Sequence, residues 1–161
     1  MCLTYGVHFF VGTLTASPPL NSSVRPQPKY RYKLEGKHVS PKQLVQEWVR
    51  RFNEGDIDGL ASLYATDAIN HQVVMEPLHG RAAIRHMFEV EFGRAAMTCL
   101  VESIFEDGEW AILEWRDPNG LRGCGFFHVL NEQIIFQRGY FDQLSFFRLQ
   151  GIAVPESYLG A

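Results

Sequence analysis

Two hydrophobic periodicities divide the sequence, and their order constrains the fold more than any other feature. Between Ser40 and Phe92 the apolar residues recur with the spacing of amphipathic helices, apart from one short strand signal at residues 67–74, whereas from Thr98 onward they follow strand-like patterns broken by turn signals. Helical segments followed by strands that tight turns connect are typical of an α+β protein, and not of a parallel β-α-β arrangement. We therefore expect helices that pack against an antiparallel meander.

Three segments are predicted to be helices. Ser40 is a favourable N-cap, Pro41 suits the first helical position, and Gln43 completes a capping box. Asp56 caps a second, short helix, and a third follows Gly80. The apolar side of the second helix is predicted to contain Ile57, Leu60, Leu63 and Tyr64.

Five segments have strand signals. They are residues 67–74, 98–105, 110–117, 121–130 and 134–147. The sequence Asp117-Pro118-Asn119-Gly120 is a strong turn signal, because proline favours its second position and glycine its last.

Pairing of Asp117 with Leu121 across this turn decides which side chains share a face of the sheet, since side chains alternate along each strand. The more apolar set is assigned to the interior and consists of Leu113, Trp115, Asp117, Leu121, Gly123, Gly125 and Phe127. We expect the glycines opposite Trp115 to leave volume for a ligand.

Composition divides the chain into a leader at residues 1–39, a domain at residues 40–147 and a tail at residues 148–161. Prolines in the first thirty residues favour an extended leader. Residues 1–40 contain five Lys/Arg and one Glu, whereas residues 41–161 contain ten Lys/Arg and seventeen Asp/Glu. An acidic body without a basic stripe argues against nucleic-acid binding, because phosphate contacts dominate that affinity.

Other patterns exclude further classes of protein. No apolar run approaches the roughly 20 residues that span a bilayer, so no membrane partner is expected. The three cysteines lack a CxxC spacing, which favours reduced thiols and a cytoplasmic protein. The six histidines show no ligand spacing, so neither a metal nor another cofactor is expected.

Several of these segments carry a family resemblance. The stretches Val45–Leu60, Tyr64–Ala68, Gly80–Ile84, Gly125–Phe127 and Arg138–Asp142 resemble the SnoaL-like branch of the nuclear transport factor 2-like superfamily over about residues 41–147. The resemblance implies a cystatin-like cone, in which a curved antiparallel sheet wraps three N-terminal helices around a deep apolar pocket. Its members are often dimers, so we expect a homodimer through the outer face of the sheet.

The superfamily contains ketosteroid isomerases, limonene epoxide hydrolases, polyketide cyclases and non-catalytic binding domains, so the resemblance leaves the function open. Of the Asp-Arg-Asp set of limonene epoxide hydrolases, this sequence keeps one acid at Asp117. The arginine position has Trp115 and the other aspartate position has Gly139, while the tyrosine and asparagine that hold water correspond to Asn70 and Gln72. Epoxide hydrolysis by that mechanism is therefore disfavoured.

The ketosteroid isomerase pattern is also incomplete. Its base would correspond to Asn70 or His71, and the tyrosine and aspartic acid of its oxyanion hole to Trp48 and Gly125. Glycine has no side-chain donor, so that form of the oxyanion hole is lost.

His71 and Asp117 are the candidate catalytic residues. If it faces inward, His71 is the one base near neutrality in the pocket region. Asp117 beside Trp115 and Phe127 would lose hydration of its charged form, which would suit it to proton transfer. The alternative is that Asp117 accepts backbone N–H groups as the first residue of its turn.

Two hypotheses for the function remain. One is cofactor-free acid/base isomerisation, cyclisation or dehydration of a small, largely apolar, carbonyl-bearing molecule. The other is a non-catalytic module for ligand binding or dimerisation. The candidate ligand-binding residues are Trp48, Asn70, Gln72, Trp115, Phe127 and Phe141.

Overall fold

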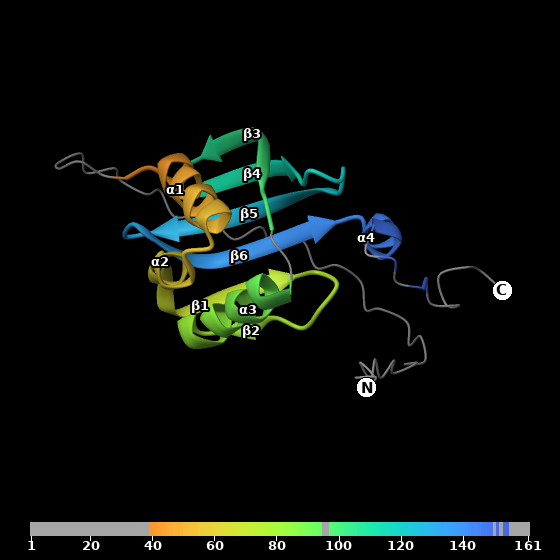
Figure 1. The fold of residues 1–161 in the computed structure, drawn as a ribbon. Helices are drawn as coiled ribbons and strands as arrows, with labels where there is room; N and C mark the ends of the chain where they lie inside the picture. Colours follow the sequence, from red (N-terminus) through yellow and green to blue (C-terminus); the bar gives the residue numbers. More distant parts are fainter. Residues whose placement is uncertain (1–38, 95–96, 150, 152, 155–161) are drawn as a thin grey trace, which may run out of the picture. The chain divides into compact units, whose positions relative to one another are not determined.

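A curved six-stranded sheet carries helices α1, α2 and α3 on one face (Figure 1). The computed structural model describes residues 39–94, 97–149, 151 and 153–154. The elements are α1 (Pro41–Glu54), α2 (Ile57–Ser62), β1 (Tyr64–Gln72), β2 (Leu78–His79), α3 (Arg81–Arg94), β3 (Leu100–Asp107), β4 (Trp110–Arg116), β5 (Arg122–Leu130), β6 (Gln133–Phe141) and α4 (Gln143–Leu149). The strand order β2-β1-β6-β5-β4-β3 and the three helices confirm the predicted α+β class.

The start of α1 confirms the predicted capping box. Ser40 Oγ accepts a hydrogen bond from the backbone N–H of Gln43 at 3.3 Å, and Gln43 Oε1 accepts one from the backbone N–H of Ser40 at 2.9 Å. Glu106 of β3 also accepts hydrogen bonds from Ser40 Oγ at 2.7 Å and from the backbone N–H of Lys42 at 2.6 Å. A carboxylate at a helix N-terminus is favourable, so Glu106 both caps α1 and fastens it to the edge strand.

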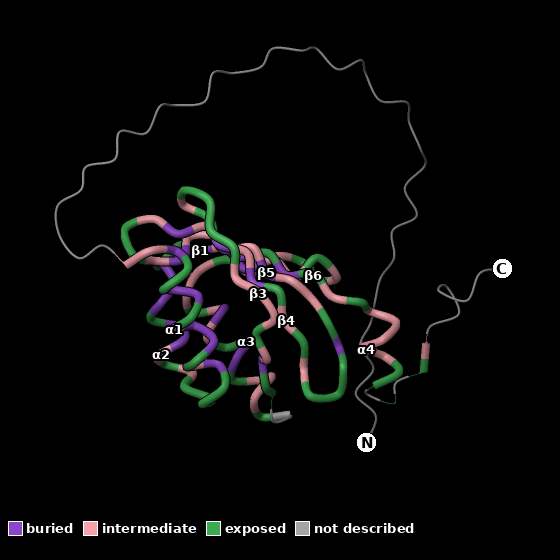
Figure 2. Tube along the Cα trace, turned by 90° about the horizontal axis from the view of Figure 1, so that it is seen from above, coloured by how far each residue is buried: buried purple, intermediate pink, exposed green. Residues whose placement is uncertain are grey.

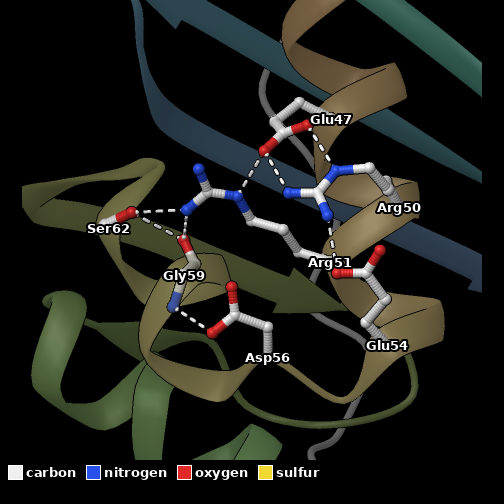
Figure 3. Close-up of polar contacts among 7 residues, drawn as sticks. All are labelled: Glu47, Arg50, Arg51, Glu54, Asp56, Gly59 and Ser62. Atoms are coloured by element: carbon white, nitrogen blue, oxygen red, sulfur yellow. Dashed lines mark hydrogen bonds and ion pairs between the residues drawn. The ribbon is translucent and has the colours of Figure 1, made fainter.

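The junction between α1 and α2 is closed by Arg51 and Asp56 (Figure 3). Asp56 Oδ1 accepts a hydrogen bond from the N–H of Gly59 at 2.9 Å, which caps α2 as predicted. Arg51 donates to the carbonyl of Gly59 at 2.7 Å, to Ser62 Oγ at 3.0 Å and to Glu47 Oε1 at 2.6 Å. A Cβ on Gly59 would lie 1.8 Å from Asp56 Oδ2, so a larger residue here would displace the Asp56 side chain from its capping position.

The core lies between the helices and the sheet, where the buried stretches of both face one another (Figure 2). Its centre is an aromatic cluster of Trp48, Phe52, Phe88, Phe92 and Phe127. The rings of Trp48 and Phe52 stack with centroids 5.0 Å apart, and Phe127 meets Trp48 edge-on at 5.4 Å. Such offset and edge-on pairs add to the stabilisation that burial of the rings gives.

The register of β4 and β5 is the one that the turn predicts. Trp115 pairs with Gly123, and the backbone N–H of Asp117 donates to the carbonyl of Leu121 at 2.8 Å. The members of the predicted interior set that lie within β4 and β5 therefore share the helix-covered face, where Phe127 contacts Trp48. The pairing that local patterns did not predict is the parallel one, in which β1 lies beside β6.

Two predicted boundaries are wrong. Tyr64 does not belong to α2, which ends at Ser62, but begins β1, where it pairs with Ile134 of β6. The last strand does not continue to Phe147 but ends at Phe141, because Asp142 accepts hydrogen bonds from the backbone N–H of Leu144 and the hydroxyl of Ser145 and so caps α4.

The described residues cover only part of the predicted leader and tail. The leader at residues 1–39 lies outside the described residues except for Val39, as does most of the tail at residues 148–161. The predicted boundary between residues 147 and 148 falls inside α4.

Substitution of Gly59 by alanine is expected to destabilise the protein, although alanine normally favours a helix. The new Cβ must displace the Asp56 cap and Arg51, and loss of a cap costs about 1 kcal/mol. A matched control is Gly93→Ala in α3, where a Cβ meets nothing within 4 Å and about 0.5 kcal/mol of stabilisation is expected. Urea unfolding measures both changes, and an increase of stability for Gly59→Ala would contradict the assignment.

Candidate functional site

A series of uncharged polar side chains crosses the interior between α1 and the sheet. We call Trp48, Tyr64, Gln137, Asn70 and Gln72 the interior polar chain. The indole N–H of Trp48 donates to the hydroxyl of Tyr64 at 2.8 Å, and that hydroxyl donates to Gln137 Oε1. Asn70 Nδ2 donates to the same oxygen at 3.0 Å, and Gln72 Nε2 donates to Asn70 Oδ1 at 3.0 Å.

The parallel pairing of β1 and β6 assembles this chain. It places Asn70 opposite Gln137 and Gln72 opposite Gly139. Because side chains alternate along a strand, Asn70 and Gln72 both point to the helix-covered face, where α1 supplies Trp48.

Four of the five side chains of the interior polar chain are buried, Gln72 is half-buried, and none of the five carries a charge. Asn70 is 1% exposed and Gln137 is 5% exposed, and within the described residues these two are the polar side chains classed as buried. Burial raises the pKa of Tyr64 well above its ordinary range, so its phenol stays protonated. The five side chains therefore offer hydrogen-bond donors and acceptors without a charge of their own, and the nearby Glu91 carboxylate adds to the rise of the Tyr64 pKa.

Two atoms of the chain remain open for a further partner. Within the described part of the protein, neither Gln137 Nε2 nor Gln72 Oε1 forms a hydrogen bond. No fully buried side-chain nitrogen or oxygen of that part lacks a partner. These two atoms must consequently reach accessible space.

Asp117 and His71 are placed apart from each other. Asp117 Oδ1 accepts hydrogen bonds from the backbone N–H groups of Asn119 at 2.9 Å and Leu121 at 2.8 Å, which is the turn role that the sequence also allowed. His71 lies between Asn70 and Gln72, so its side chain takes the opposite face of β1, with Arg138 as its neighbour on β6. The catalytic role of both residues stays a prediction.

Two of the predicted aromatic ligand contacts, Trp115 and Phe127, lie on the helix-covered face of the sheet. The volume that we expect beside the glycines is filled. A Cβ on Gly123 would lie 2.6 Å from the ring of Trp115, and one on Gly125 would lie 2.9 Å from the ring of Phe127. The expectation that these glycines leave space for a ligand is therefore wrong: they make room for the neighbouring rings.

The other two predicted contacts differ in their surroundings. Trp48 belongs to the aromatic cluster and has its N–H engaged by Tyr64. Phe141 is half-buried at the end of β6, where its ring lies 5.7 Å from that of Phe146 in α4.

Sequence reasoning missed Tyr64 and Gln137. Tyr64 was hidden by the apolar spacing that extends from α2 into β1. Gln137 had a usable signal, because alternation from Gly139 on the same strand places it on the interior face.

Four exposed apolar residues lie near the end of the sheet that contains Gln72. They are Val73, Met75, Met97 and Val101, which are 38%, 53%, 37% and 45% exposed. Val73 and Met75 follow β1, whereas Met97 precedes β3 and Val101 lies near its start, and β6, β5 and β4 separate these two strands.

Metal and membrane sites find no support in the described residues. No group of three or more His, Cys, Asp or Glu side chains there is arranged to hold a metal ion. None of the helices in that part is both long and apolar enough to cross a bilayer.

Comparison with known proteins decides the family. Residues 45–136 match the model of the SnoaL-like domain. The chain belongs to the SnoaL-like domain family. None of the curated proteins matches it.

Solved structures similar to this SnoaL-like domain agree on the fold. An NTF2-like protein of unknown function from Cytophaga hutchinsonii has a TM-score of 0.60 at 16% identity and covers 70% of this chain and 99% of its own. An LEH-like epoxide hydrolase from M. tuberculosis has a TM-score of 0.61 at 20% identity, with coverage of 68% and 87%. The epoxide hydrolase/cyclase-like enzyme SalBIII, which has a role in pyran ring formation in salinomycin, has a TM-score of 0.59 at 22% identity, with coverage of 65% and 92%.

Two substitutions of Asp117 test its role in the turn. Asp117→Ala removes the acceptor of two backbone N–H groups and is expected to lower the free energy of unfolding by about 1–2 kcal/mol. Asp117→Asn keeps an acceptor oxygen and is expected to change it by less than about 0.5 kcal/mol. Chemical denaturation checks both values, and equal losses would argue against the turn role.

Proposed function

We propose that this SnoaL-like domain binds a small, largely apolar molecule whose polar group is an uncharged carbonyl or hydroxyl. The observation that carries the proposal is the interior polar chain, whose five side chains are uncharged and which has two hydrogen-bonding atoms without a partner among the described residues. The aromatic cluster around Trp48 and the exposed apolar residues that follow β1 supply surroundings that favour an apolar ligand.

The absence of charged side chains from the interior polar chain decides which ligands are favoured. Transfer of an ionised group from water to such surroundings is costly unless an opposite charge or several hydrogen bonds compensate for it. Desolvation of a carbonyl or hydroxyl costs less free energy than desolvation of an ion. Its hydrogen bond to water can be replaced by one to Gln137 Nε2 or Gln72 Oε1.

Binding without catalysis is the version that the geometry favours. Acid/base catalysis needs a group that changes protonation near its substrate. Asp117 accepts hydrogen bonds from two backbone N–H groups of its turn, and the side chain of His71 lies on the opposite face of β1. The interior polar chain itself contains only amides, an indole and a protonated phenol. A cofactor-free isomerase or cyclase that uses His71 and Asp117 together would need another arrangement of these two residues.

The proposal predicts that 2-acetylnaphthalene, an apolar ketone, raises the melting temperature of the protein. Gln137→Leu is expected to abolish this shift, because it removes the Nε2 donor while keeping a similar side-chain size. Gln133→Leu, on the same strand but outside the interior polar chain, is the matched control and should retain the shift. Circular dichroism verifies that each variant is folded, and a shift that survives in Gln137→Leu would reject the site.

A panel of ketosteroids, epoxides and polyketide mimics tests the catalytic alternative. The binding proposal expects no turnover by the wild-type protein. Turnover that His71→Ala or Asp117→Asn removes would replace it with the acid/base mechanism.

We further propose that the protein forms a homodimer through the sheet face opposite the helices. Aromatic side chains from four strands occupy this face: Phe105, Trp110, Phe126, Phe136 and Tyr140. Phe105 is 60% exposed, Trp110 38% and Tyr140 39%. A second copy supplies a matching apolar face in a two-fold arrangement.

Sedimentation analysis tests the dimer. The wild-type protein is expected to have the mass of two chains, and Tyr140→Glu the mass of one, because the new charge lies beside Phe126 on this face. Met75→Glu, which alters an exposed apolar residue of the β1–β2 connection, should leave the dimer intact. A monomeric wild type would contradict this proposal.

A further inference from the structure

The carboxamide of Gln72 occupies the position that a side chain at residue 139 would take. A Cβ built on Gly139 would lie 1.9 Å from Gln72 Oε1, 2.6 Å from its Cδ and 2.8 Å from its Nε2. All three distances are shorter than side-chain carbons tolerate, so Gln72 can lie across β6 because residue 139 is glycine. Gly139 is itself buried, on the same face as Gln137.

Hydrogen bonds hold the side-chain amides of Gln137 and Gln72 in one orientation. Gln137 Oε1 accepts from both Tyr64 and Asn70, so the Nε2 of Gln137 is left as a donor. Gln72 Nε2 donates to Asn70 Oδ1, so its Oε1 is left as an acceptor. Rotation of either amide by half a turn would place a donor against a donor or an acceptor against an acceptor.

We infer that the site recognises a ligand head group that is uncharged and has both a hydrogen-bond acceptor and a donor, as a carboxamide does. In this arrangement the ligand acceptor faces Gln137 Nε2 and the ligand donor faces Gln72 Oε1. Gly139 is the specificity-determining position, since it allows Gln72 to take its place in the site. The inference rests on the proposed ligand-binding function and narrows its ligand class.

A carboxylate of the same shape fits this arrangement poorly. It offers two acceptors, one of which would face the carbonyl oxygen of Gln72 without a proton between them. Within the described residues no buried cation is present to compensate for its charge. An unmatched acceptor and a lost hydrogen bond together correspond to at least about a tenfold weaker affinity.

Three probes that share one ring system test the inference on the full-length protein. 2-Naphthamide has a donor and an acceptor, 2-acetylnaphthalene has an acceptor alone, and 2-naphthoate is charged at neutral pH. Titration calorimetry is expected to give the tightest binding for the amide, weaker binding for the ketone, and at least about tenfold weaker binding for the carboxylate than for the amide.

Two variants test the role of Gly139 through the ratio of the amide and ketone affinities. Gln72→Leu removes the acceptor, and Gly139→Ala displaces it without deleting a polar group, so each is expected to bring this ratio close to one. Gly93→Ala, where the added methyl group meets open space, is the control and should keep the wild-type ratio. A merely structural role of Gly139 would weaken both ligands equally and leave the ratio unchanged.

The outcomes separate this inference from the proposed function. Comparable affinities for the amide and the carboxylate would overturn the inference while ligand binding stands. Absence of binding by all three probes would overturn both. If Gly139→Ala does not fold, an amide-to-ketone ratio that persists in Gln72→Leu still overturns the inference, and its loss supports it.

Discussion

The parallel pairing of β1 with β6 is the contact on which the arrangement of the interior depends. It joins strands that lie about seventy residues apart in the sequence and places Asn70 beside Gln137. Without it, neither amide would have its partner, and two polar side chains would be buried with unmet hydrogen bonds, which is costly in a low-dielectric interior. The same pairing places Gln72 opposite Gly139, and the carboxamide of Gln72 fills the space that a side chain at residue 139 would occupy.

The interior polar chain combines structural and functional consequences. Two of its four hydrogen bonds converge on one oxygen, Gln137 Oε1, which orients Tyr64 and Asn70 toward the same acceptor. A neutral, oriented set of this kind suits recognition of an uncharged ligand, because it offers geometry without the cost of a buried charge. It is less suited to proton transfer, since none of its members changes protonation near neutral pH.

Membership of the SnoaL-like family establishes the fold and leaves the chemistry to the site. The LEH-like epoxide hydrolase resembles this chain in fold but is only 20% identical to it in sequence, which is too little to transfer an activity. The interior residues of this chain carry the functional argument instead. Three acidic side chains outside this site have structural roles, since Glu106 caps α1, Asp56 caps α2 and Asp117 stabilises a turn.

Local sequence determined those parts of the protein whose interactions are themselves local. The capping box at Ser40 defined the start of α1, and the Pro-Asn-Gly turn after Asp117 defined the register of β4 and β5, because both depend on residues within a few positions of each other. Tertiary structure decided where Tyr64 and Gln137 lie. Tyr64 fits the helical spacing of α2 as well as the first position of β1, and pairing with β6 settles the choice. The interior polar chain was beyond local patterns for the same reason, since its hydrogen bonds join residues that only the folded sheet brings together.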